Sequence, residues 1–291
     1  MADISFQNEQ QVDTVGAKRS LPAVSDVDEK ASMPRKRFFR TRAHCNPLSH
    51  NDGFEYPVSP SEIDWAIYYP KIPETERVVR ILDIGMGFGG LTVSLATLFP
   101  DKLVMGMEIR AKVCEYVRRR IEALRVEHPG QYNNASCLRT NCMRYLPNFF
   151  KKQQIEKIFI CFPDPHFKAK NHQRRIVSHP LLSEYAYIMK PGGRLYVVTD
   201  VEELHLWHVA KCDGHPAFRR IPDEDAEKEN PAVHARMLES TEESKKVARL
   251  GGNKHFAVYE RLPDWDSSIS TTATATATAA RGDSSGDADN S

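Results

Sequence analysis

The chain has 291 residues, of which 41% are hydrophobic and 27% charged, and its formal net charge is +1. This length suits one α/β domain with tails, or two small domains at most. No apolar run approaches the ~20 residues of a membrane-spanning helix, and the polar N-terminus lacks a signal-peptide pattern. We therefore expect an intracellular protein without a membrane segment.

The six cysteines are scattered, without C-x-x-C pairs and without a histidine partner at zinc-ligand spacing. This usage is typical of reduced thiols in a cytosolic or nuclear protein. We expect no structural metal.

Composition divides the chain into three parts. Residues 1–33 are polar and aperiodic, and 266–291 hold a Thr/Ala repeat and an acidic Gly/Ser/Asp tail, so both are predicted to be disordered. The domain spans 34–265, with a basic lead-in over 34–77. Within it, Pro34–Arg42 interleaves basic and aromatic residues, which fits a nuclear-localisation signal, an RNA-contacting arm or a solvated lead-in.

The domain alternates apolar runs with helical patterns. Strands are expected at 78–84, 102–107, 135–139, 155–161, 194–199, 217–221 and 255–260. Helices are expected at 90–98, 111–127, 142–152, 174–189, 202–212 and 241–249. This alternation predicts an α/β fold: a seven-stranded, mostly parallel sheet with helices on both faces and an antiparallel last strand.

The first strand runs into four glycines between Gly85 and Gly90, and a helical stretch follows. A strand, tight turn and helix N-terminus let the backbone approach a nucleotide-like ligand. The next strand ends at Glu108, where an acid commonly holds the ribose hydroxyls of an adenosine cofactor. Asp83 and the glycine at every second position favour S-adenosylmethionine. A nicotinamide or flavin cofactor and a ligand-free turn remain the alternatives.

The fourth strand leads into Phe162-Pro-Asp164-Pro165, where two prolines bracket an acid. Each proline fixes its own φ and restricts the residue before it, so Asp164 is predicted to lie in a stiff, functional loop. Basic groups follow at Lys168, Lys170, His172, Arg174 and Arg175. They suit a phosphate backbone, with a solvated helix face as the alternative.

Ligands of parallel sheets bind at the carboxyl ends of strands, near the topological switch point. Polar groups follow several predicted strands, at 85–90, Glu108, Asn141, 162–166 and Asp200. We expect these groups to converge on one cleft.

Together these motifs resemble the tRNA (guanine-N7)-methyltransferase family. The resemblance rests on Asp83–Gly90, Glu108-Ile-Arg110, Phe162–Lys168, Thr199-Asp200 and Ser240–Glu243, and on Arg42–Pro47 and Asp64-Trp65, similar to the lead-in of eukaryotic members. It covers about residues 35 to 263 and implies a Rossmann-like class I methyltransferase fold. It also implies methyl transfer from S-adenosyl-L-methionine to N7 of a tRNA guanine, in the variable loop.

The resemblance also implies site residues. The cofactor would meet Gly85, Gly87, Glu108, Ile109, Arg110, Asn141, Cys142, Cys161, Thr241, Glu242 and Glu243, with Glu108 at the ribose and Asn141 and Cys142 around the adenine. Asp164 matches the active-site acid. The substrate would meet Lys168 and Asp200, and we expect its backbone to contact Arg40, Arg42, Lys170, Arg174 and Arg175.

Guanine N7 carries an in-plane lone pair and needs no deprotonation, so we expect Asp164, with Glu243, to fix the guanine rather than act as an obligate base. The resemblance implies a WD-repeat, non-catalytic partner subunit, and we expect the nucleus, with the cytoplasm as a second location. Two alternatives remain: a class I methyltransferase acting on another RNA, a protein or a small molecule, and a non-catalytic RNA-binding subunit.

Overall fold

The computed structural model describes residues 32–41, 45–48, 53–54 and 56–264. Nearly all of both tails predicted to be disordered, and Arg42, lie outside these residues. A seven-stranded sheet has the order β3-β2-β1-β4-β5-β7-β6. The strands are β1 Val79–Ile84, β2 Leu103–Glu108, β3 Ala135–Arg139, β4 Ile155–Cys161, β5 Met189–Thr199, β6 Phe218–Ile221 and β7 His255–Arg261.

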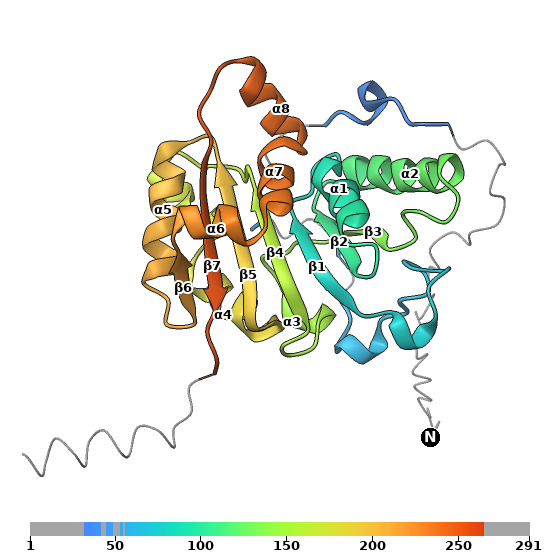
Figure 1. Ribbon diagram of the computed structural model, residues 1–291, viewed down its shortest axis with the longest axis horizontal. Coiled ribbons are helices and arrows are strands. Elements are labelled where there is room, and N and C mark those ends of the chain that lie inside the picture. The colour runs from blue at the N-terminus through green and yellow to red at the C-terminus, as the bar shows by residue number, and fades with distance from the viewer. Residues whose placement is uncertain (1–31, 42–44, 49–52, 55, 265–291) are drawn as a thin grey trace, which may run out of the picture.

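The helices follow the strands as expected for an α/β fold (Figure 1). The α-helices are α1 Gly90–Leu98, α2 Ala111–Glu127, α3 Leu146–Phe149, α4 His179–Ile188, α5 Glu202–Asp213, α6 Asp223–Glu229, α7 Pro231–Glu239 and α8 Glu242–Arg249. Short 3-10 helices are η1 Lys36–Phe39, η2 Pro60–Glu62, η3 Glu74–Glu76 and η4 Ala169–Arg174.

Strands β1 to β5 are parallel, and β7 pairs antiparallel with both β5 and β6. The predicted fold class is therefore confirmed. After β1 the chain builds β2 and β3 on one side, then returns to build β4 and β5 on the other. The switch point thus lies between β1 and β4, and their carboxyl ends frame it.

Two apolar clusters cover the two faces of the sheet. In β1, Ile81 belongs to the cluster that contains Leu91 of α1 and Val117 of α2. The next residue, Leu82, belongs to the cluster that contains Tyr185 of α4. Successive side chains of a strand point to opposite faces, and Figure 1 shows α1, α6 and α7 in front of the sheet. The sheet is buried between helical layers, which leaves its edges and strand ends for function.

Four helices differ from the sequence prediction. The helix expected over 142–152 shrinks to α3, because Tyr145 adopts a left-handed φ of 53° directly before it. The helix expected from 174 begins at His179, after η4. Helices α6 and α7 were missed, because α6 is short and highly charged and α7 buries only Val233 and Met237. The Asn230 side chain caps α7 by accepting from the Val233 amide.

Candidate active site

The loop after β1 is a turn with an open concave side. Gly85 and Gly87 have φ values of +75° and +54°, and a Cβ added to either would meet no atom within 4 Å. The amides of Gly85 and Met86 both donate to the Met107 carbonyl, at 2.9 and 3.1 Å, which pins the loop to β2. Left-handed backbone beside open space is what a glycine supplies where a ligand lies against the chain, so the loop fits the amino-acid tail of the predicted cofactor.

Three groups near these strand ends, Asp83, Cys142 and Cys161, have raised pKa values. Asp83 is buried and accepts from the Thr92 hydroxyl at 2.7 Å. Burial raises the pKa of Asp83 to about 6, and the Glu108 charge adds to the rise. Burial also raises the pKa of Cys142, to which Glu108 and Asp83 contribute, and that of Cys161, to which Asp83 contributes. The structure therefore brings together groups from β1, β2, β4 and the β3 end.

Glu108, at the end of β2, is buried and held rigidly by Arg110. The Arg110 amide and Nε donate to Oε1, both at 3.0 Å, and Nη2 donates to Oε2 at 2.9 Å. A carboxylate accepts about four hydrogen bonds, so about one acceptor position on Oε2 remains. Glu108 thus fits one ribose hydroxyl as it stands, and a second requires Arg110 to shift.

Asn141 follows β3 and joins the lead-in to the strand ends. Its buried side-chain amide donates to the Pro47 carbonyl at 2.6 Å and accepts from the Met143 amide at 3.0 Å. The neighbouring Cys142 is buried as well. The Asn141 side chain therefore ties the lead-in to the segment after β3.

The loop that carries Asp164 has an unusual backbone. Phe162 and His166 adopt left-handed φ values of 54° and 45° on either side of the acid, at a cost of about 1–3 kcal/mol each. The Phe162 amide donates to the Val198 carbonyl at 2.7 Å, and the His166 amide donates to Asp164 Oδ1 at 3.3 Å. The Asp164 side chain is 25% exposed. Strain around a part-exposed acid at a strand end supports a functional role.

The basic residues after Asp164 divide into two groups. Lys168 and Lys170 are exposed and Arg174 is half-buried, so they can reach a ligand. Arg175 is 2% exposed; its Nε donates to the Pro165 carbonyl at 2.9 Å and its Nη2 to Glu203 at 2.7 Å. The prediction that Arg175 contacts the substrate backbone is therefore wrong for this conformation, because burial and these two partners engage its guanidinium.

The N-terminus of α8 adjoins the glycine loop. A Cβ at Gly90 would collide with the Ser240 carbonyl oxygen, so the two segments touch backbone to backbone. Thr241 caps α8 by accepting from the Ser244 amide at 2.9 Å. Glu242 pairs with Lys36 at 2.5 Å, and Glu243 pairs with Lys246 at 2.7 Å. The predicted residues Thr241–Glu243 thus lie next to the glycine loop, with both carboxylates paired to cations.

The lead-in supplies contacts that the sequence did not reveal. Phe39 packs edge-on against Tyr116 of α2, and Lys36 lies over the Phe88 ring of the glycine loop. Arg120 of α2 donates to the Phe88 carbonyl at 2.9 Å. Part of the basic stretch is therefore docked beside the glycine loop, while Arg40 stays exposed.

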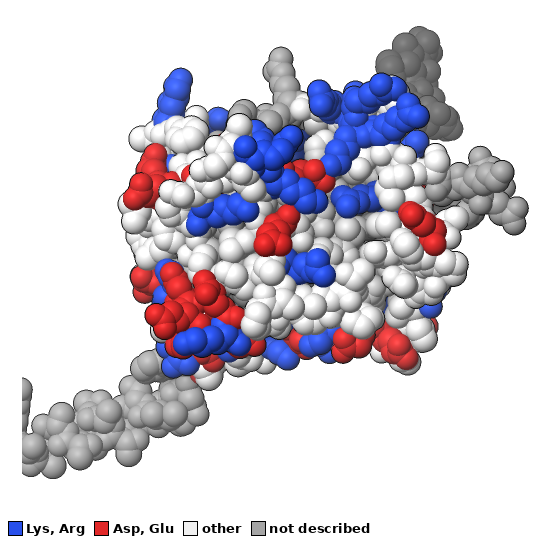
Figure 2. All heavy atoms as spheres, turned by 45° about the horizontal axis from the view of Figure 1, so that its top comes forward, with Lys and Arg blue, Asp and Glu red and all other residues white. Residues whose placement is uncertain are grey.

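The remaining predicted residues lie at strand ends. Ile109 and Cys161 are half-buried after β2 and at the end of β4, and Asp200 is exposed directly after β5. Figure 2 shows Lys and Arg gathered over the upper part of the molecule, where Figure 1 places α8 and the 36–39 segment, whereas Asp and Glu gather below. The side of the molecule at the carboxyl ends of the parallel strands is thus the positively charged side.

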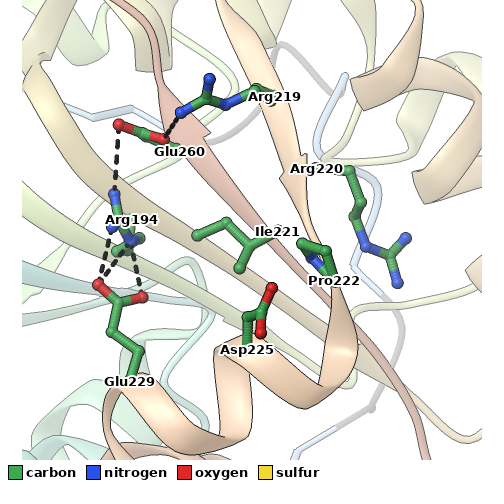
Figure 3. Close-up of a pocket in the computed structure, with 8 residues that line it drawn as sticks. All are labelled: Arg194, Arg219, Arg220, Ile221, Pro222, Asp225, Glu229 and Glu260. Carbon is green, nitrogen blue, oxygen red and sulfur yellow. Dashed lines mark hydrogen bonds and ion pairs between the residues drawn. The ribbon is translucent and has the colours of Figure 1, made fainter.

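A separate groove of about 490 Å³ lies between β5, β6, β7 and α6 (Figure 3). It is lined by Arg194, Arg219, Arg220, Ile221, Pro222, Asp225, Glu229 and Glu260. Arg194 pairs with Glu229 at 2.7 Å, and Arg219 pairs with Glu260 at 2.6 Å. These charges neutralise one another, and the lining of the groove includes no residue of the glycine loop.

Among the described residues, no three or more His, Cys, Asp or Glu side chains come together as a metal site would require. The described helices also include none with the length and apolar character needed to cross a membrane.

Comparison with known proteins gives consistent matches. A family model described as "Putative methyltransferase" matches residues 77–257. A tRNA (guanine-N(7)-)-methyltransferase of Schizosaccharomyces pombe is 54% identical over 80% of this chain and 86% of its own length. One from Brugia malayi is 48% identical over 82% of this chain and 91% of its own length. Among solved structures, an aminoglycoside resistance methyltransferase overlaps 65% of this chain and 89% of its own, with 17% identity and a TM-score of 0.39.

Proposed function

The chain belongs to the tRNA (guanine-N(7)-)-methyltransferase family, and from this we propose that it methylates N7 of a guanine in tRNA. The methyl donor is S-adenosyl-L-methionine, whose sulfonium supplies an electrophilic methyl group. The match to the Schizosaccharomyces pombe enzyme carries the proposal, because it spans nearly the whole described domain. The strained acid loop at the switch point supports it from the structure.

The cofactor is held by the glycine loop and by Glu108. The open backbone at Gly85 and Gly87 takes the methionine tail, and the remaining acceptor position on Glu108 takes a ribose hydroxyl. Arg110 orients the Glu108 carboxylate, because its three donors hold both carboxylate oxygens. Ile109, Cys142 and Cys161 line the apolar side of the adenosine, and Thr241 closes the pocket next to Gly90.

Asp164 holds the guanine by its Watson–Crick edge. The guanine N1–H and N2 amine are both donors, so one carboxylate can accept both. N7 already has a lone pair, so the chain's task is to align N7 with the methyl group and exclude water, which can lower the barrier by up to about 7–11 kcal/mol. A carboxylate nearby also stabilises the positive charge that the base gains on methylation.

The tRNA is held by cations on the positively charged edge of the sheet. Lys168, Lys170 and Arg174 follow the Asp164 loop, and Arg40 lies exposed next to the docked segment 36–39. A guanine within folded tRNA must turn outward to reach the acid, at a cost of a few kcal/mol. Contacts from these cations to phosphates offset that cost. We propose a guanine of the variable loop as the target, by resemblance to the family.

We also propose a WD-repeat subunit as the partner that helps to hold the tRNA, and the nucleus as the principal location. The exposed basic residues Arg35, Arg37 and Arg40 support a nuclear signal within the lead-in. Lys36 is not available for it in this conformation, because it pairs with Glu242.

The test is methyl transfer from labelled S-adenosyl-L-methionine to bulk tRNA, with and without a WD-repeat subunit, followed by nucleoside digestion. We expect label in N7-methylguanosine with the wild-type chain and its loss with Asp164→Ala. Absence of label in both conditions, despite cofactor binding, would refute the proposed function and direct the search to other acceptors.

A further inference from the structure

We propose that Arg175 is a positioning residue that holds the Asp164 loop in its strained conformation. The proposal rests on the proposed function, because Asp164 is the group whose placement it controls. Arg175 belongs to a basic run, yet it is 2% exposed and reaches back ten residues to the Pro165 carbonyl. It acts on the backbone one residue after the acid, so it fixes the loop without touching the substrate.

The loop needs such a restraint because its backbone is unfavourable. Left-handed φ values at Phe162 and His166 persist only where the surroundings impose them. The strand side is fixed by the hydrogen bond from the Phe162 amide to the Val198 carbonyl. On the other side of the acid, Arg175 donates to Pro165 and thereby restrains the segment between the two left-handed residues.

The platform that supports Arg175 is itself anchored. Arg175 Nη2 donates to Glu203 at 2.7 Å, and the Arg175 guanidinium lies 4.7 Å from the centroid of the Trp207 ring. The Trp207 indole donates to the Val177 carbonyl at 2.8 Å, and the Tyr185 hydroxyl donates to the Ile176 carbonyl at 2.8 Å. The segment after Arg175 is therefore tied to both α4 and α5, so the side chain projects from a fixed point.

Arginine suits this position better than lysine. Its planar fork presents Nε and Nη2 in fixed directions, which serves a carbonyl and a carboxylate at once while its face stacks on an indole. Glu203 compensates the buried charge, and its place in the first turn of α5 links the restraint to the end of β5, where Asp200 lies. Arg175 therefore connects the loop after β4 with the junction after β5.

Arg194 is the matched control, because its guanidinium also binds a carboxylate and a backbone carbonyl. It donates to Glu229 in the groove of Figure 3. It also donates to the Gly192 carbonyl at 2.7 Å. We expect Arg175→Met to lower kcat about tenfold to a hundredfold, since small misplacements at a reacting centre have effects of this size. KM for tRNA and cofactor affinity should change less than about twofold, and Arg194→Met should leave all three unchanged.

A double-mutant cycle separates positioning from general stability. In an Asp164→Asn background, Arg175→Met should cost less than about twofold, because the group it positions is already altered. Hydrogen exchange should show amides of residues 163–174 exchanging about tenfold faster in Arg175→Met, with β4 and β5 unchanged. If Arg175→Met does not fold, Arg175→Lys and Glu203→Gln are measured in the same way, with smaller expected losses of kcat.

Three results would overturn the proposal. A raised KM for tRNA with unchanged kcat and a weaker salt dependence would instead assign Arg175 to a phosphate. Equal losses in the wild-type and Asp164→Asn backgrounds would assign it to stability alone. Unchanged exchange over 163–174 would remove the restraint itself. Should the wild-type chain form no N7-methylguanosine, the proposed function fails, and the exchange measurement alone decides whether Arg175 holds the loop.

Discussion

Two arginine networks, around Arg175 and Arg194, have similar partners but different backbones. At the carboxyl ends, Arg175 joins Glu203 to the Pro165 carbonyl of a loop with two left-handed residues. Toward the amino end of β5, Arg194 joins Glu229 to the Gly192 carbonyl. Gly192 adopts its φ of +76° without strain, because glycine has no Cβ. Arg175 is nearly fully buried, whereas Arg194 is 18% exposed. Similar chemistry therefore restrains a costly conformation at one end and ties ordinary elements together at the other.

The strongest way to test this contrast is to remove one acid from each end. Asp164→Ala should lower kcat/KM on the order of a hundredfold to a thousandfold, because it removes a group aimed at developing charge. Asp225→Ala, in the groove of Figure 3, should leave activity within about twofold. Steady-state methylation of tRNA measures both. Comparable losses in the two variants would contradict the assignment of the active site to the carboxyl ends.

The buried Asp83 carboxylate, at the carboxyl end of β1, should lower the free energy of unfolding near neutral pH. Burial raises its pKa from 3.8 to about 6, so the folded state binds a proton more tightly than the unfolded state. The free energy of unfolding should therefore fall as pH rises from about 4 through about 6, with a contribution of about 3 kcal/mol. Urea unfolding across this range, compared with Asp83→Asn, measures it. An identical pH dependence in the two proteins would rule out this contribution.

Glu108 and Glu229 each pair with an arginine, but they should differ in their effect on the cofactor. Glu108→Gln should weaken S-adenosyl-L-methionine binding about thirtyfold, or about 2 kcal/mol, because it removes a charged acceptor beside Arg110. Glu229→Gln makes the same change beside Arg194 and should leave cofactor affinity unchanged. Calorimetric titration measures both. Full affinity in Glu108→Gln would place the ribose elsewhere.

Exposed lysines at the two ends should differ in RNA binding. Replacing Lys168 and Lys170 together by Met should weaken tRNA binding about tenfold and reduce the slope of log K against log salt by about 1.5 to 2. The same change at Lys190 and Lys228, on the opposite side, should have little effect. Filter binding at several salt concentrations measures both. Equal slopes in the two double variants would indicate that charge alone, without location, drives binding.

The smallest expected effect concerns Arg194 and stability. Arg194→Met should lower the free energy of unfolding by about 1 kcal/mol, because it breaks a part-exposed pair with Glu229. The kcat for tRNA methylation should stay within about twofold. Urea unfolding together with the methylation assay measures both quantities. A fall in kcat of more than about twofold in the folded variant would mean that the groove affects the active site.

Strong local signals allowed much of the site to be predicted from the sequence. The glycines between 85 and 90 follow a buried strand, and the prolines around Asp164 restrict the backbone whatever surrounds them. The end of β2 placed Glu108 correctly, because the carboxyl ends of parallel strands share one edge. The fold class followed from the same alternation of apolar runs and helical patterns.

Other features depend on contacts between distant segments. Arg174 and Arg175 are adjacent and chemically alike, yet only the packing of α5 decides that Arg175 is buried against Glu203 and Trp207. The Asn141 side chain meets Pro47, 94 residues earlier, and no local pattern encodes that approach. Sequence periodicity shows which face of an element is apolar. The sequence by itself therefore determined most helices and strands of this protein and the chemical groups that follow them. The tertiary structure decided which charges are buried and which remain for the substrate, because burial depends on the neighbour that covers each side chain.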